Sequence, residues 1–339
     1  SDSRLVRNPR PHRTRFVNFE PSTRADCTLW TGFATLGPAV ISSTLDYRSN
    51  VSLPCDCAWK NTPRNSPQIG SSALGPRCAK RHRSSFDEMD LRLIRNATLR
   101  LRFAGTEFLI DPMLGVRGSI RAMGDSTERN PTVDLPCSID DVLEGVDVVL
   151  VSHLHPDHFD EAAFGVVPRD LPVFCQPGDT DKLSAAGFAS TPLDGPTRIG
   201  RASVTPVAAS HGSESIVERM GSVLGLVFRA DDEPTLYWAG DTILCDPVRE
   251  TLAVVQPNVI VTHSGGATAG SQTIIMNVAD TLEVAQTAPN ATVIAVHLEA
   301  VGHAPVTRLA LRQQATAAGI ESTRLQIPAD GETITIRVA

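Results

Sequence analysis

The spacing of hydrophobic positions changes along the chain and predicts strands and helices in turn. Residues 148–152 form a short apolar run rich in β-branched side chains, which is typical of a buried, parallel, central strand. Residues 159–164 follow with the pattern expected for the first turns of a helix. After several initial strands the two kinds of element alternate, which indicates a layered α/β fold. Further strands are expected at 90–95, 98–103, 107–110, 172–175, 201–207, 222–228, 235–239, 259–262, 292–296 and 333–338, and further helices at 139–143, 179–186, 247–255, 276–287 and 307–318.

Three histidines and an aspartate lie within six residues, between the central strand and the helix that follows it. They form the motif His153-Leu-His155-Pro-Asp157-His158. Sites in α/β sheets usually lie where strands end, and imidazole and carboxylate groups suit zinc, iron and manganese. His153 and His155 are two residues apart in extended backbone, so both can point to one side. Asp157 and His158 lie beyond the bend. One metal ion cannot readily take all four side chains, but two neighbouring ions can.

Other predicted strands end in residues of the same chemical kinds. His211, Asp241, His263 and His297 each come directly after, or shortly after, a predicted strand. A glycine precedes Asp241 and allows the backbone to approach closely. Asp111 ends an earlier strand, and we expect it to hydrogen-bond the loops that carry the metal ligands.

The order of these motifs resembles the metallo-β-lactamase superfamily. The motif H-x-H-x-D-H is followed by a separate histidine, then by Gly-Asp, then by another histidine, and the match covers most of residues 89–339. The flanks at 235–242 and 293–300, with a domain of about 250 residues, look like the branch that contains ascorbate-6-phosphate lactonase. The resemblance implies an α/β fold of four layers, the αβ/βα sandwich of that superfamily.

The resemblance also implies two metal positions joined by a shared carboxylate. His263 competes with His297 for the last ligand place, and His297 is preferred because a helix precedes its strand as in that branch. His263 is then a candidate wall residue or proton donor. His303 is a candidate for orienting a ligand or touching substrate, with a plain surface role as the alternative. The implied ligands are His153, His155 and His211 for one metal, Asp157, His158 and His297 for the other, and Asp241 for both; the candidate catalytic residues are Asp157, Asp241, His263 and His303.

The implied cofactors are two divalent metal ions, zinc being preferred and manganese or iron being the alternatives. Two such ions can lower the pKa of a bridging water from about 15.7 to about 7, so that hydroxide exists at neutral pH. We therefore expect a hydrolase that uses this hydroxide to cleave a small-molecule ester, lactone or phosphoester. The runner-up is a metal-dependent nuclease or phosphodiesterase. A third reading is a metal-binding or redox protein of the same fold without hydrolytic turnover.

Charge divides the chain into two unlike parts. Residues 1–88 contain 13 basic and seven acidic residues, whereas residues 89–339 contain 18 basic and 31 acidic residues. The first part also lacks periodic apolar positions, which predicts a disordered or non-native N-terminal extension. Met89 is the expected natural start, and residues 89–339 are the expected hydrolase domain. The acidic charge of that domain argues against a nucleic-acid partner.

The sequence also gives expectations about the cellular location and the partners of the protein. No segment reaches the roughly 18 apolar residues needed to span a membrane, and the first residues lack the apolar centre of a signal peptide. Seven cysteines is an odd number, which is typical of reduced thiols in a cytoplasmic protein. We expect a cytoplasmic protein with a small-molecule substrate and no nucleic-acid or membrane partner; the oligomeric state stays open. Loops at 113–137 and 212–220 are expected to shape the pocket.

Overall fold

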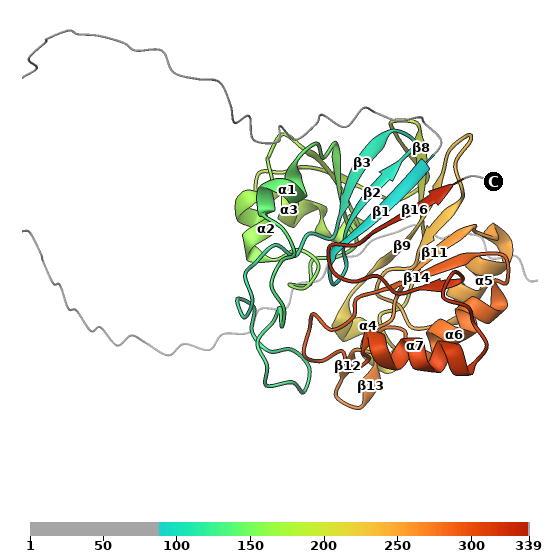
Figure 1. Ribbon diagram of the computed structural model, residues 1–339. Helices are drawn as coiled ribbons and strands as arrows, with labels where there is room; N and C mark the ends of the chain where they lie inside the picture. The colour runs from blue at the N-terminus through green and yellow to red at the C-terminus, as the bar shows by residue number, and fades with distance from the viewer. Residues whose placement is uncertain (1–87, 338–339) are drawn as a thin grey trace, which may run out of the picture. The chain divides into compact units, whose positions relative to one another are not determined.

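Residues 88–337 are described by the computed structural model, and they form two seven-stranded sheets with helices outside them (Figure 1). The extension expected at residues 1–88 lies outside the described residues except for Glu88, so that expectation stays a prediction. None of the helices in the described range is long and apolar enough to cross a membrane.

The first sheet has the strand order β16-β1-β2-β3-β4-β5-β6. Its central strand, β4, pairs in parallel with β3 on one side and β5 on the other, and all four of its residues are buried. This confirms the buried parallel strand predicted in front of the histidine motif. The strands of this sheet are β1 (Glu88–Arg95), β2 (Thr98–Phe103), β3 (Thr106–Ile110), β4 (Val148–Val151), β5 (Pro172–Cys175), β6 (Ala189–Pro192) and β16 (Thr333–Arg337).

The second sheet has the strand order β15-β14-β11-β10-β9-β8-β7. From β10 to β15 the neighbouring strands are parallel, so their carboxyl ends meet at one edge of the sheet. The strands are β7 (Thr197–Ile199), β8 (Ala202–Ala208), β9 (Leu224–Arg229), β10 (Leu236–Trp238), β11 (Val259–His263), β14 (Thr292–Val296) and β15 (Leu325–Gln326), and a separate hairpin pairs β12 (Thr268–Ala269) with β13 (Gln272–Thr273).

The predicted four-layer sandwich is confirmed by where the apolar side chains pack. Phe103 and Phe108 of the first sheet meet Phe228 of the second edge-to-face, with ring centroids 5.8 and 5.6 Å apart, in the core between the sheets. A second core lies between the first sheet and its helices, and a third between the second sheet and its helices. The helices are α1 (Ile139–Leu143), α2 (Glu161–Val166) and α3 (Thr180–Ala185) on the first sheet, α5 (Asp246–Val255), α6 (Val278–Thr287) and α7 (Arg308–Ala317) on the second, and α4 (Glu214–Met220) after β8.

Local chemistry accounts for several of these boundaries. Ala104 and Gly105 both have positive φ, 51° and 79°, as the two central residues of a tight turn between β2 and β3 require. Ser138 caps α1 and Asn277 caps α6, and in each case an aspartate three residues later completes a capping box. These turns and caps are the reason that the hairpin and both helices lie close to their predicted positions.

One predicted loop is wrong. Residues 212–220 were expected to be a loop, but 214–220 form α4, which ends at Gly221 with φ at 82°. Length alone does not explain this miss, because the shorter α1 and α2 were predicted; unlike them, α4 has no side-chain capping hydrogen bond at its N-terminus. The short strands β6, β7, β12, β13 and β15 were not predicted either. The segment at 113–137, by contrast, is irregular as expected and contains a single isolated bridge between Ile120 and Asn130.

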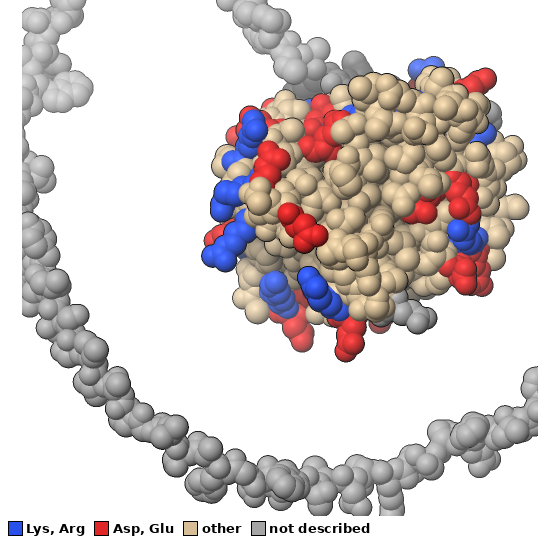
Figure 2. Space-filling view, turned by 90° about the horizontal axis from the view of Figure 1, so that it is seen from below, with Lys and Arg blue, Asp and Glu red and all other residues tan. Residues whose placement is uncertain are grey.

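Charged side chains of both signs are interspersed on the face that carries the β12–β13 hairpin, which Figure 2 shows from below. A broad uncharged area occupies the middle of the described part of this face. Basic side chains follow the left and lower-left edge of this view, next to acidic ones.

Candidate metal centre

The candidate ligands gather where strands of both sheets end. His153 begins the loop after β4 in the first sheet, and His211 follows β8 in the second. Asp241, His263 and His297 come from the ends of β10, β11 and β14, which are parallel neighbours. The parallel pairing therefore brings these three side chains to one edge, facing the histidine motif.

The first cluster, which we call the triple-histidine group, consists of His153, His155 and His211. Nε2 of His153 lies 2.9 Å from Nδ1 of His155, and Nε2 of His211 lies 3.3 Å from the same atom. Nδ1 of His211 lies 2.8 Å from the backbone oxygen of Ile274, which calls for a proton on Nδ1 and leaves the Nε2 lone pair free. The three candidate ligand atoms lie within 4.8 Å of one another, close enough to surround one metal ion.

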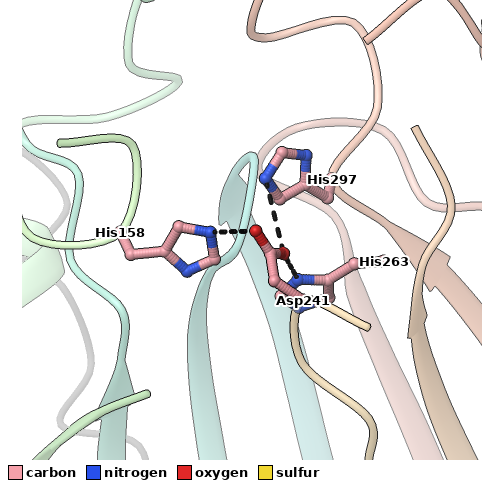
Figure 3. Close-up of side chains that lie close together, drawn as sticks. All are labelled: His158, Asp241, His263 and His297. Carbon is pink, nitrogen blue, oxygen red and sulfur yellow. Dashed lines mark hydrogen bonds and ion pairs between the residues drawn. The ribbon is translucent and has the colours of Figure 1, made fainter. Parts of the chain in front are cut away.

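The second cluster, which we call the buried group, consists of His158, Asp241, His263 and His297 (Figure 3). Oδ2 of Asp241 lies 3.1 Å from Nε2 of His158. Oδ1 of the same carboxylate lies 2.6 Å from Nδ1 of His263 and 3.8 Å from Nε2 of His297. All four side chains are buried, so the carboxylate is surrounded by imidazoles rather than by solvent.

Asp241 also faces the triple-histidine group. Its Oδ2 atom lies 3.4 Å from Nε2 of His211 and 3.9 Å from Nε2 of His153. One carboxylate oxygen is therefore close to imidazole nitrogens of both clusters. This is the position that a carboxylate shared by two metal ions would need.

Asp157 lies beside the buried group. Its Oδ2 atom is 3.3 Å from Nε2 of His297, and its side chain is almost fully buried. Of the set expected for the second metal, His158 and His297 belong to the buried group, whereas Asp157 lies outside it and contacts His297. The buried group also includes His263, so both histidines that competed for the last ligand position lie beside Asp241.

The protonation of these residues fits a divalent cation. Burial lowers the pKa of His153 and of His211, so both imidazoles are neutral at pH 7 and offer lone pairs. Burial alone would raise the pKa of Asp241, but the charges of His158 and His297 hold it well below its usual range. Nε2 of His263 and Nδ1 of His297 are buried without a hydrogen-bond partner. Despite its burial, the charges of Asp241 and Asp111 hold the pKa of His158 well above its usual value, so this ring would give up its Nε2 proton when a metal ion binds. Imidazoles around an ionised carboxylate are a donor set that zinc, iron and manganese accept.

A hydrogen-bond network below the clusters fixes two of the rings. Oδ2 of Asp111 lies 2.8 Å from Nδ1 of His158, and Oδ1 accepts the backbone N–H of Ser152 at 2.7 Å. The Ser152 hydroxyl lies 2.7 Å from Asp111 and 2.9 Å from Nδ1 of His153. Asp111 therefore has the supporting contacts expected from its position at the end of β3, and such contacts orient metal-binding imidazoles.

Asn96 is a residue of this region that the sequence analysis did not identify. It lies in the turn between β1 and β2, is fully buried, and has a positive φ of 57°. Its Nδ2 atom donates to the backbone oxygen of Asp157 at 3.1 Å and lies 3.2 Å from Nε2 of His297. A short turn between two strands was visible in the sequence, but no pattern indicates which distant residues it contacts.

A cavity of about 170 Å³ lies at the two clusters. His155, His211 and Asp241 form part of its lining, together with Asp157 and His297. The remaining wall is largely apolar and comes from the loop at 113–137, from α4 and from the β12–β13 region. The residues of that wall are Met123, Gly124, Arg219, Met220, Ala267, Thr268, Ala269, Ile274 and His303.

The structure separates the two histidines that were candidates for a role beside the metals. His303 lines the cavity, and its Nδ1 atom is buried without a hydrogen-bond partner. Burial lowers the pKa of His303, so the ring is neutral at pH 7. His263 is fully buried and is not among the residues that line the cavity. Burial lowers the pKa of His263 to about 4, so it too is neutral.

Comparison with known proteins gives a consistent picture. The beta-lactamase superfamily domain matches residues 106–298 of the chain. The chain is 37% identical over 254 residues to the UPF0173 protein YddR of Bacillus subtilis, a match that covers 73% of this chain and 100% of that protein. It is 31% identical over 189 residues to a UPF0173 metal-dependent hydrolase of Azorhizobium caulinodans, covering 52% of this chain and 73% of that protein.

Two solved structures are similar along their whole length. The isothiocyanate hydrolase from Delia radicum gut bacteria is 36% identical, with a TM-score of 0.71, and the match covers 74% of this chain and 100% of that chain. A possible metal-dependent hydrolase from Veillonella parvula is 33% identical, with the same TM-score of 0.71 and the same coverage of 74% and 100%. The narrower resemblance to the ascorbate-6-phosphate lactonase branch is not confirmed by these relatives and stays a prediction.

Proposed function

We propose a function for this chain from the premise that it belongs to the beta-lactamase superfamily and is a metal-dependent hydrolase. What we add to that premise concerns the number of metal ions, the work of individual residues and the class of substrate. The observation that carries the proposal is the place of Asp241, whose Oδ2 atom lies 3.1 Å from His158 and 3.4 Å from His211.

In the proposed enzyme each cluster holds one divalent metal ion. The triple-histidine group supplies three imidazoles to one ion, whereas Asp157, His158 and His297 supply the other, and Asp241 is shared. Two bound ions would lower the pKa of a water molecule and polarise the bond under attack. Zinc is the preferred identity because imidazole nitrogens outnumber carboxylates in the set.

The chain's own residues keep these ligands in place. Asp111 and Ser152 hold the rings of His158 and His153 through their Nδ1 atoms, which leaves the Nε2 atoms to point toward Asp241. Neutral His263 donates its Nδ1 proton to Asp241 at 2.6 Å and so fixes the rotation of the shared carboxylate. In this account His263 orients a ligand, and His297 is the ligand, as the sequence analysis preferred.

The cavity favours a small substrate with an apolar part. Its volume of about 170 Å³ is well below the roughly 300–1,000 Å³ of pockets that enclose drug-sized molecules. Met123, Met220 and Ile274 are among the lining residues, and flexible methionine side chains adapt to apolar groups of varied shape. Arg219 is the one basic side chain in the described lining and is exposed, so the cavity is poorly suited to a large anion.

Among small molecules with an electrophilic carbon, we favour an isothiocyanate. The similarity to an isothiocyanate hydrolase, 36% identical along its whole length, supports this class over a phosphoester. In the proposed reaction, water adds its oxygen to the central carbon of R–N=C=S and the carbon–nitrogen bond breaks. Both hydrogens of the water end on nitrogen, which gives R–NH2 and O=C=S. His303 lines the cavity and is our candidate for carrying the proton to the leaving nitrogen.

A substrate panel on metal-loaded protein tests this function. The panel contains an alkyl and an aryl isothiocyanate, a small lactone, an ethyl ester, a phosphodiester and a single-stranded oligonucleotide. We expect the isothiocyanates to give the highest kcat/KM, with carbonyl sulfide and amine released in equal amounts. Turnover of the lactone or the ester alone would still support metal-dependent hydrolysis but would contradict the proposed isothiocyanate substrate. Turnover of the phosphodiester alone would contradict the proposal and favour the nuclease or phosphodiesterase alternative.

A further inference from the structure

The turn between β1 and β2 reaches into the metal centre although it carries none of the expected ligands. Turn residues ordinarily lie at the surface, yet Asn96 in this turn has no exposed surface at all. Arg95, the residue before it, is also fully buried, and its guanidinium donates to the backbone oxygens of Met113, Gly115 and Val133 at 2.8, 2.8 and 3.1 Å. Arg95 therefore holds the loop at 113–137, while Asn96 faces the ligands.

Asn96 contacts the backbone of two proposed ligands of the second metal. Its Nδ2 atom donates to the backbone carbonyl oxygen of Asp157 at 3.1 Å, and its backbone carbonyl oxygen accepts the backbone N–H of His297 at 2.9 Å. Neither backbone atom is needed to bind a metal ion, so both contacts can persist when the side chains of Asp157 and His297 take one. The third contact, Nδ2 of Asn96 to Nε2 of His297 at 3.2 Å, is between side chains.

The backbone of His297 requires such support. Its φ is 60°, in the left-handed region that non-glycine residues seldom adopt. This conformation turns the chain at the end of β14 so that Nε2 lies 3.3 Å from Asp157. The hydrogen bond from the His297 backbone N–H to Asn96 fixes that turn from the opposite sheet. Asn96 thereby links the loop of the histidine motif to the end of β14.

We infer that Asn96 is a positioning residue for the second metal position, and this role rests on the two-metal function proposed above. By holding the backbones of Asp157 and His297 at a fixed separation, it keeps both side chains ready for one ion. The triple-histidine group has no contact with Asn96, so the first metal position does not depend on it. The expected signature is a selective loss of the second metal, with the first unaffected.

The test is a titration of metal-free full-length protein with Co(II), followed by visible absorption, and with Zn(II), followed by calorimetry. Asn96→Gly tolerates positive φ and removes the Nδ2 contacts to the Asp157 backbone and the His297 ring, while the backbone hydrogen bond to His297 stays in place. Asn96→Ser keeps a polar group that is too short to make both side-chain contacts. Asp232→Gly is the matched control, because Asp232 is an exposed residue with φ of 65° in the turn between β9 and β10. Thermal unfolding of each metal-free variant establishes that it is folded.

We expect both Asn96 variants to weaken metal binding at the buried group by roughly 10- to 100-fold, as loss of a supporting partner of a ligand typically does, with binding at the triple-histidine group within about twofold of wild type. Asp232→Gly should match wild type at both positions. Unchanged binding at the buried group in a folded Asn96 variant would overturn the inference, and so would equal weakening at both positions. Wild-type protein that takes up only one equivalent would instead overturn the two-metal function on which the inference depends.

Discussion

The two clusters at the strand ends differ in how firmly the protein holds them. In the triple-histidine group, His155 is partly exposed and its ring contacts only the rings of His153 and His211. In the buried group every side chain is enclosed. Asp111 contacts the ring of His158, Asn96 contacts that of His297, and Asp241 contacts those of His158 and His263. The first cluster is thus open toward the cavity on one side, whereas the second is fixed from several sides.

If each cluster holds a metal ion as proposed, this difference predicts different roles for the two ions. A metal ion in the buried group would be held by residues that are already oriented, so little ordering would accompany its binding. A metal ion in the triple-histidine group would lie beside the cavity, with His155 free to adjust. We therefore expect the metal of the triple-histidine group to exchange faster and to contact the substrate first.

The largest effect should come from removing the one residue that both clusters share. We expect Asp241→Ala to lose bound metal and nearly all turnover, because both positions lose a ligand and His158 and His263 lose their carboxylate partner. Elemental analysis of the purified variant checks the metal content. Asp170→Ala, at an exposed aspartate that belongs to neither cluster, is the control and should behave as wild type. Retention of two equivalents of metal by Asp241→Ala would refute the shared role.

A smaller and more selective effect should separate the two histidines beside Asp241. We expect His297→Ala to lose the metal of the buried group and His263→Ala to keep both metals. Because His263 donates to a buried carboxylate, its removal should still lower the stability of the metal-free protein by about 1–3 kcal/mol. Metal analysis and thermal unfolding of the two variants, side by side, provide the measurement. The reverse pattern of metal loss would make His263 the ligand.

A third effect, on turnover alone, should come from the cavity wall beside the triple-histidine group, without any change in metal content. We expect His303→Ala to lower kcat by about 10²-fold or more, because a proton carrier at the cavity wall is lost while every proposed ligand remains. The variant should bind two equivalents of metal with wild-type affinity. If kcat stayed within about twofold of wild type, His303 would have only a structural role in the wall.

The smallest effect is expected from removing residues 1–88. The proposed ligands lie beyond residue 150, and the Bacillus subtilis relative matches over 254 residues, which is close to the length of 89–339. A chain that starts at Met89 should therefore fold, bind the same metals and keep full turnover. Metal content and kcat/KM of the shortened and full-length proteins are the comparison. Insolubility of the shortened chain, or loss of either metal, would place the first segment within the functional fold.

The sequence predicts those parts of the site that depend on neighbouring strands. A carboxylate or histidine at each strand end is visible without a structure, and the parallel order of β10, β11 and β14 then forces them together. The same logic could not choose between His263 and His297. In the register of the sheet, His263 pairs with Val296, the residue before His297. The side chains of His263 and His297 therefore lie at the same edge.

The parts that the sequence does not predict depend on contacts between distant segments. Asn96 is 61 residues from Asp157 and 201 residues from His297, and nothing local to the turn indicates those partners. The helix α4, whose last residue Met220 lines the cavity, was also missed; it lacks the side-chain cap that α1 and α2 have. Strand ends could therefore be located from pattern alone, whereas the supports and walls around them required the three-dimensional arrangement.

The most direct test of the two-metal account is a titration of metal-free wild-type protein with Zn(II), in which bound metal and turnover are measured on the same samples. The account predicts two equivalents per chain, with tight filling of the buried group first and full turnover only after the second equivalent binds. Full turnover with a single equivalent bound, and no further change as more zinc is added, would contradict it.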